Sequence, residues 1–147
     1  MLQDIPSPKN PVPLRLPDWP LPAYRYVPGL HPHPFRMEGG HMFQDGLAPE
    51  HPAWQPHSDW KSDRIWLRGL DLFDQRFYWE CHESFEAMWH VLERGSLLHR
   101  LSQGLIQSAA SVLKRHMGHE KSADYLFARS TEKLVSVAEE TGGLCRG

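Results

Sequence analysis

The sequence predicts an all-α protein, a compact up-down bundle of about four helices arranged as two tetratricopeptide-like hairpins, preceded by an irregular Pro/His-rich segment. Two observations predict this fold. All 13 prolines lie in the first 56 residues, where they prevent regular helix. The remainder carries apolar residues at helical spacing, interrupted by glycine and turn residues. We therefore divide the chain into an extended arm with loops at 1–57, a helical domain at 58–142 and a frayed tail at 143–147.

Composition and charge narrow the possible partners. A net charge of −2 and a pI near 6.5 give no reason to expect nucleic acid or an anionic membrane as partner. No apolar run approaches the ~20 residues of a membrane helix, and the first residues do not resemble a signal peptide. The cysteines, Cys81 and Cys145, form no disulfide or metal pattern, and Cys81 is interpreted as a small buried hydrophobe. We expect a cytoplasmic protein whose partner is a small molecule or another protein.

The N-terminal arm is predicted to be extended and to lie on the helical domain, because apolar residues alternate with its prolines. Three histidines, His31, His33 and His41, follow in a proline-rich loop. Proline on both sides of His33 restricts its backbone and lowers the entropy cost of ordering a site. Two interpretations remain open: the loop binds a metal or an anion, or its histidines form hydrogen bonds across the domain. His57 is expected at the surface.

Cap and breaker residues predict four helices. Their expected bounds are from Ser58 or Asp59 to Phe73, from a turn at 74–76 to about Gly95, from a cap at Ser96 to Met117, and from Glu120 to Glu140. The third helix is apolar on two faces, which predicts a central position. The fourth should bury an inner stripe of Ala123, Leu126, Phe127, Ser130, Leu134, Val137 and Ala138. A faint repeat aligns Arg76, Cys81 and Phe85 with Gly118, Ala123 and Phe127.

The second predicted helix combines aromatic residues with a polar cluster. His82 and Glu86 are four residues apart and Glu83 and Glu86 are three apart, so their side chains should converge. We interpret the cluster as part of the binding site of a non-enzymatic ligand- or partner-binding module. The residues expected to line this buried polar site are His82, Glu83, Glu86, Trp89, Gln103 and Gln107. A purely structural hydrogen-bond network is the alternative.

An enzymatic interpretation is also open, although neither the His-Glu-x-x-His motif nor a paired Glu-x-x-His motif is present. In a metal-dependent hydrolase, Glu83 would act as general base on a metal-bound water. The metal, which would be zinc, iron or manganese, would be held by His33, His41, His82 and Glu86. A further possibility is a homodimer formed through exposed aromatic residues such as Trp54, Trp60 or Trp79.

Two runs of residues resemble the bacterial family known as domain of unknown function 309. The first run comprises Gly69, Phe73, Tyr78, Glu80, His82, Glu83, Glu86 and Trp89, and the second is Gln103-Gly104-Leu105-Ile106-Gln107. The resemblance covers roughly 66–134 and implies an all-helical fold without implying a particular reaction. A further likeness to the N-terminal extension of one branch rests on Tyr26, Pro28, Gly29, Pro32, His33, Pro34, Gly40 and His41. Arg76 replaces the glycine usual in the first inter-helix turn, so a left-handed backbone is not expected there.

Overall fold

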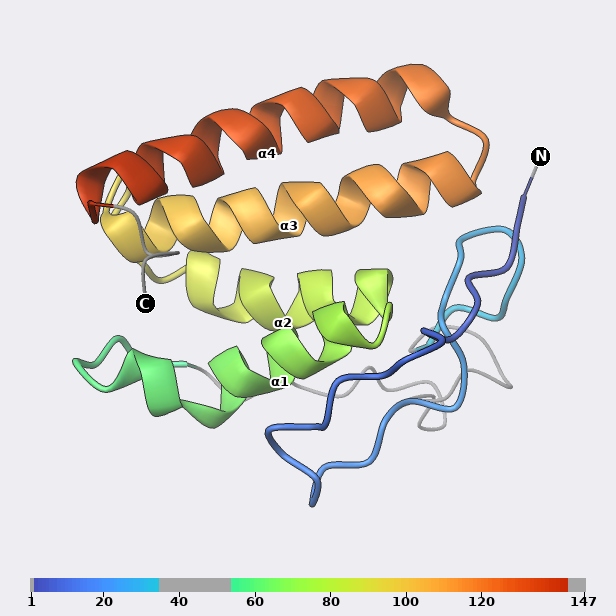
Figure 1. Ribbon diagram of the computed structural model, residues 1–147, viewed down its shortest axis with the longest axis horizontal. Helices are drawn as coiled ribbons and strands as arrows, with labels where there is room; N and C mark the ends of the chain where they lie inside the picture. Colours follow the sequence, from blue (N-terminus) through green and yellow to red (C-terminus); the bar gives the residue numbers. More distant parts are fainter. Residues whose placement is uncertain (1, 35–53, 143–147) are drawn as a thin grey trace.

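The computed structural model describes residues 2–34 and 54–142, and all regular secondary structure in these ranges is helical. The elements are a short 3-10 helix η1 (Trp60–Ser62), followed by α1 (Arg64–Asp74), α2 (Tyr78–Trp89), α3 (Leu97–His116) and α4 (Glu120–Glu140). Each helix packs against the next one in sequence, and Figure 1 shows α3 lying between α2 and α4. The all-α prediction, the two hairpins and the central third helix are confirmed. None of the helices in the described ranges is long and apolar enough to cross a membrane.

Two helix boundaries differ from the prediction. Helix α1 begins at Arg64, because the carboxylate of Asp63 accepts hydrogen bonds from the backbone N–H groups of Ile65 and Trp66 and satisfies two free donors of the first turn. The predicted cap residue Asp59 instead precedes η1 and makes no side-chain cap bond. Helix α2 ends at Trp89, well before the predicted Gly95. The predicted cap at Ser96 and the predicted extent of α4 are confirmed.

The main core forms where α1, α2 and α3 meet. Its buried members are Trp54, Trp66, Leu72, Phe77, Cys81, Phe85, Met88, Leu98 and Ala109. Gly69 in α1 makes room for this packing: a Cβ atom there would lie 2.5 Å from Cε1 of Phe85, so any larger residue would displace a fully buried ring. Cys81 is fully buried, as predicted, and burial raises the pKa of its thiol well above the ordinary value.

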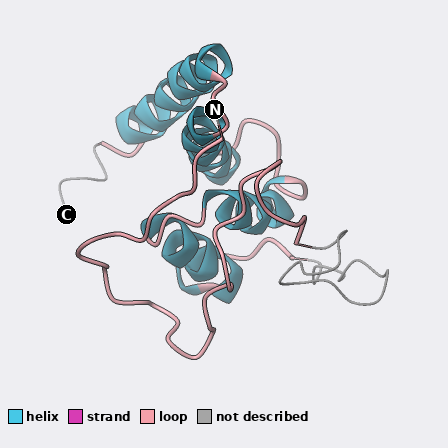
Figure 2. Cartoon of the chain, turned by 90° about the vertical axis from the view of Figure 1, so that its right-hand side faces the viewer, coloured by secondary structure: helices cyan, strands magenta, loops and turns pink. Residues whose placement is uncertain are grey.

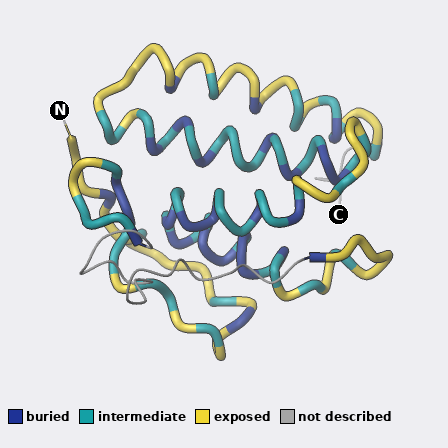
Figure 3. The backbone as a smooth tube through the Cα atoms, turned by 180° about the vertical axis from the view of Figure 1, so that it is seen from behind, coloured by how far each residue is buried: buried dark blue, intermediate teal, exposed yellow. Residues whose placement is uncertain are grey.

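Two aromatic residues lie elsewhere than predicted. Phe127, expected in the inner stripe of α4, is 60% exposed, because the buried side of that helix runs through Ala123, Ser130 and Val137. Figure 3 shows that much of α4 is exposed. Trp54, offered as an exposed dimer contact, is only 5% exposed and belongs to the main core. The inner-stripe prediction for Phe127 and the exposed position predicted for Trp54 are therefore wrong.

The turn between α1 and α2 has a left-handed residue although no glycine is present. Arg76 has a φ of 67°, and the N–H of the next residue, Phe77, donates to the carbonyl of Leu72 at 2.8 Å. This 6→1 bond is the one that closes a helix C-terminus when the preceding residue is left-handed. The expectation drawn from the absence of glycine is therefore wrong, and the tertiary packing outweighs a conformational cost of about 1–2 kcal/mol.

The N-terminal arm docks on α1 through hydrogen bonds between its backbone and buried side chains. Asp71, 1% exposed, accepts from the N–H groups of Arg15 and Leu16 at 2.9 Å each. Arg68 donates to the carbonyl of Trp19 at 3.0 Å. An extended, proline-rich segment has no ladder of its own, so the helix supplies its partners. Figure 2 shows the arm as loop running alongside the helices; its predicted contact with the helical domain is confirmed.

Candidate functional site

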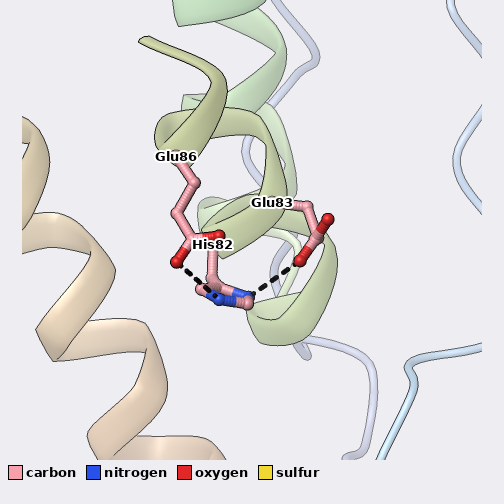
Figure 4. A group of neighbouring side chains, drawn as sticks. All are labelled: His82, Glu83 and Glu86. Carbon is pink, nitrogen blue, oxygen red and sulfur yellow. Dashed lines mark ion pairs between the residues drawn. The ribbon is translucent and has the colours of Figure 1, made fainter. Parts of the chain in front are cut away.

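Three polar side chains converge on one side of α2. His82 lies between two carboxylates (Figure 4), with Nε2 3.2 Å from Oε1 of Glu86 and Nδ1 3.8 Å from Oε1 of Glu83. The side chains of His82, Glu83 and Glu86 are 25%, 26% and 34% exposed, respectively. They are therefore partly withdrawn from water but still within reach of a small ion or molecule. The convergence predicted from their spacing is confirmed.

The hydrogen bonds of His82 distinguish its two ring nitrogens. Nδ1 lies 3.0 Å from the backbone carbonyl oxygen of Trp79. A carbonyl oxygen only accepts, so Nδ1 must carry the hydrogen of this bond. Nε2 is then the atom that faces the carboxylate of Glu86. A histidine whose other nitrogen donates to a backbone carbonyl is typical of metal-binding sites, where this bond fixes the ring.

The charges in this group reinforce one another. Burial disfavours the charged imidazole of His82, but its hydrogen bond to Glu86 and the charges of Glu86 and Glu83 outweigh that effect and raise the pKa of His82. The hydrogen bond from His82 in turn lowers the pKa of Glu86. Each of the two groups therefore favours the charged form of the other, an imidazolium next to a carboxylate.

The same three residues form a group that could hold a metal ion. Each offers one ligand atom, and the three atoms lie within 4.8 Å of one another. One imidazole nitrogen with two carboxylate oxygens is a ligand set used for zinc, iron and manganese. No other group of three or more such residues is close enough within 2–34 and 54–142.

A hollow adjoins this group between α2 and α3. It has a volume of about 190 Å³ and is lined by Glu86, Trp89, Gln103, Ile106 and Gln107. Glu86 thus belongs to both the charged group and the hollow. The Trp89 ring stacks on the imidazole of His99 in α3, with centroids 5.1 Å apart and planes 22° apart, which fixes its position. The predicted proximity of Gln103 and Gln107 to the His-Glu helix is confirmed.

The loop histidines do not extend the charged group among the described residues. The ring of His33 packs edge-on against Tyr26 and Trp79, with centroids 5.5 Å away in both cases, and His33 is not part of the metal-compatible group. His41 lies outside the described residues. The metal role predicted for these two histidines therefore stays a prediction. His57 is exposed, as expected, and pairs with Asp63.

Sequence reasoning missed the polar residues that hold the arm, above all Glu80. Its Oε2 accepts from the backbone N–H of Tyr26 at 3.2 Å. Burial raises the pKa of this carboxyl to about 7, although hydrogen bonds and the charges of Arg25 and Arg68 oppose the rise. Only the apolar residues of the arm indicated that it docks, and the family motif that includes Glu80 did not indicate that this carboxylate holds the arm.

Comparison with known proteins identifies the family of the central segment. Residues 66–126 match the family model described as Domain of unknown function (DUF309), so this part of the chain is a DUF309 domain. The match contains the charged group and the residues that line the hollow, and it confirms the family resemblance of the helical segment. The likeness of the N-terminal segment lies outside the match and stays a prediction. No curated protein and no solved structure matches the chain.

Proposed function

We propose that the protein is a small helical binding module that holds a divalent metal ion through His82, Glu83 and Glu86. The observation that supports this most is the arrangement of His82. Its Nδ1 is engaged with the carbonyl of Trp79, and its Nε2 faces the carboxylate of Glu86 at 3.2 Å. Two atoms that both carry lone pairs are held against each other, so a cation belongs between them, either a proton or a metal ion.

The spacing suits a metal ion. Two atoms that each lie about 2.1 Å from one metal are about 3.0 Å apart at a right angle and about 3.4 Å apart at a tetrahedral angle. The gap between Nε2 of His82 and Oε1 of Glu86, 3.2 Å, falls between these values. Glu83 is the proposed third ligand, and its ligand oxygen lies within 4.8 Å of the other two ligand atoms.

A site with three protein ligands leaves at least one coordination position for a bound molecule. The hollow next to Glu86 is where such a molecule would lie, and this favours binding as the basic function. The hydrolase alternative needs Glu83 as a base and therefore needs other residues, such as His33 and His41, as ligands. No contact among the described residues favours that arrangement over the simpler one.

The test is a metal titration of protein purified without a histidine tag and treated with a chelator. We expect one ion of Zn²⁺, Mn²⁺ or Fe²⁺ to bind per chain, and to raise the melting temperature because it binds only the folded state. Glu86→Gln keeps the size of the side chain and removes its charge. This change should weaken the binding at least tenfold, and Glu83→Gln should have the same effect to a smaller extent.

The matched control is His57→Gln. His57 pairs with Asp63 at 2.9 Å, so it is a histidine–carboxylate pair outside the metal-compatible group, and its change should leave the metal affinity unaltered. The proposal is wrong if none of the three ions binds in calorimetry, or if Glu86→Gln binds the ion as tightly as the wild type does.

A further inference from the structure

Two residues that line the hollow between α2 and α3 each carry a buried polar atom whose hydrogen-bonding capacity is unused among the described residues. The atoms are the indole Nε1 of Trp89 and the amide Oε1 of Gln107, both buried without a hydrogen-bond partner within 2–34 and 54–142, and both residues line the hollow. A buried donor or acceptor without a partner is costly, and such atoms in folded proteins usually indicate a bound water, ion or ligand.

From these two unpartnered atoms, one a donor and the other an acceptor, we infer that the hollow binds a small neutral amide or a urea-like group. The ligand binds through its carbonyl oxygen and its N–H. The indole N–H of Trp89 can only donate, so it requires an acceptor in the ligand. Oε1 of Gln107 can only accept, so it requires a donor. An amide group carries both within one planar unit.

The other lining residues define the rest of the ligand. Among the described residues, Glu86 is the charged one in the lining and none is a lysine or arginine, so the hollow without a metal ion would repel an anionic ligand. Ile106 and the ring of Trp89 offer apolar surface for a short alkyl group. The hollow has a volume of about 190 Å³, so we choose a small molecule as the probe.

This inference deepens the proposed function, since Glu86 is shared by the metal group and the hollow. The amide binds through Trp89 and Gln107, whereas the metal ion is held by His82, Glu83 and Glu86. The two claims can therefore be tested separately on the same protein.

The test uses propionamide as the probe, with the full ¹⁵N-labelled chain in the presence of chelator. The readout is the indole N–H resonance of Trp89, assigned as the signal lost in Trp89→Phe. Two probes of similar size serve as comparisons: 2-butanone, which offers only an acceptor, and protonated n-propylamine, which offers only donors. We expect propionamide to shift the signal saturably and to bind at least fivefold more tightly than either.

Two variants identify the contacts. Gln107→Leu should weaken propionamide binding about tenfold, because it removes the acceptor while keeping a side chain of similar size. Trp60→Phe, which changes a tryptophan outside the hollow, should leave the binding unaltered. Similar shifts with all three probes would overturn the inference, as would the absence of any shift up to the solubility limit.

Repeating the titration with a divalent ion separates this inference from the metal proposal. If the chain binds propionamide in chelator but takes up no ion, the amide site is supported and the metal proposal is overturned. If the chain takes up one ion, the metal proposal is supported. If its Trp89 signal then does not respond to propionamide with or without the ion, the amide inference is overturned.

Discussion

The two helical hairpins have similar turns, but their second helices bury different positions. The turns contain Arg76 and Gly118 at corresponding positions, with φ values of 67° and 81°. The next aligned pair, Cys81 and Ala123, is fully buried in both hairpins. The third pair differs, because Phe85 has no exposed surface whereas Phe127 is 60% exposed. The faint sequence repeat is therefore reflected in the turns and in the first buried position, and it ends there.

The difference follows from what surrounds each second helix. Helix α2 packs against α1 and α3, and the arm contacts it through Glu80. Helix α4 has substantial helix contacts with α3 alone. Gly69 opens space for the ring of Phe85, whereas its counterpart in the other hairpin is Ser111, which donates to the carbonyl of Ala123. Local sequence thus defines a turn, and the neighbouring elements decide which face of the following helix is buried.

The largest difference between the hairpins is expected from truncation of the aligned phenylalanines. Phe85→Ala should lower the free energy of unfolding by about 3–5 kcal/mol, since it leaves a cavity in the main core. Phe127→Ala should change it by no more than about 0.5 kcal/mol, because the ring is mostly in water. Urea denaturation of both variants measures this contrast. Equal losses would mean that α4 is covered in solution by something else.

A second contrast concerns charge, because the buried Glu80 of α2 aligns with the exposed Ser122 of α4. The folded pKa of Glu80, about 7, lies above its ordinary value of 4.5. The folded state therefore keeps a proton that the unfolded state releases, and stability falls as the pH rises between these values. From pH 5 to pH 8 the wild type should lose roughly 2–3 kcal/mol relative to Glu80→Gln.

Glu132→Gln on the exposed side of α4 is the control for this experiment, and its pH dependence should follow that of the wild type. Unfolding free energies at the two pH values, measured in urea, give the comparison. If Glu80→Gln shows the same pH slope as the wild type, the carboxyl of Glu80 is already ionised in the folded protein below neutral pH.

The smallest expected effect lies in the turns themselves. Arg76→Gly removes the cost of a left-handed side-chain-bearing residue but makes the unfolded chain more flexible, so a net gain of up to about 1 kcal/mol is expected. Gly118→Ala should instead cost about 1 kcal/mol, because alanine tolerates a positive φ poorly. Thermal melts of the pair test whether the two turns are equivalent, and opposite signs are the expected result.

Most of the fold could be predicted from the sequence because its signals are local. Apolar periodicity and the cap at Ser96 gave α3 and α4 with nearly correct bounds. The start of α1 was missed, because several Ser and Asp residues in a row can each cap a helix. The exposed position of Phe127 was missed because periodicity cannot distinguish the buried face from its flank on a helix with few neighbours.

The candidate site was predictable to the extent that it lies on one helix. The four-residue spacing of His82 and Glu86 is sufficient to bring their side chains together. The distinction between the two nitrogens of His82 could not be predicted, since it depends on the rotation of the ring toward the carbonyl of Trp79. The role of Glu80 was also hidden, because its partner is a backbone group 54 residues away in the sequence.

The docking of the arm has a consequence for the order of events during synthesis. The arm leaves the ribosome before its partners, since Arg15 and Asp71 are 56 residues apart. At about 5–20 residues per second, the arm waits roughly 3–11 seconds for that carboxylate. Its prolines exclude helix and leave the backbone hydrated during this interval. The same composition that prevents a regular hydrogen-bonded ladder within the arm thus keeps it free of competing helix until α1 is available.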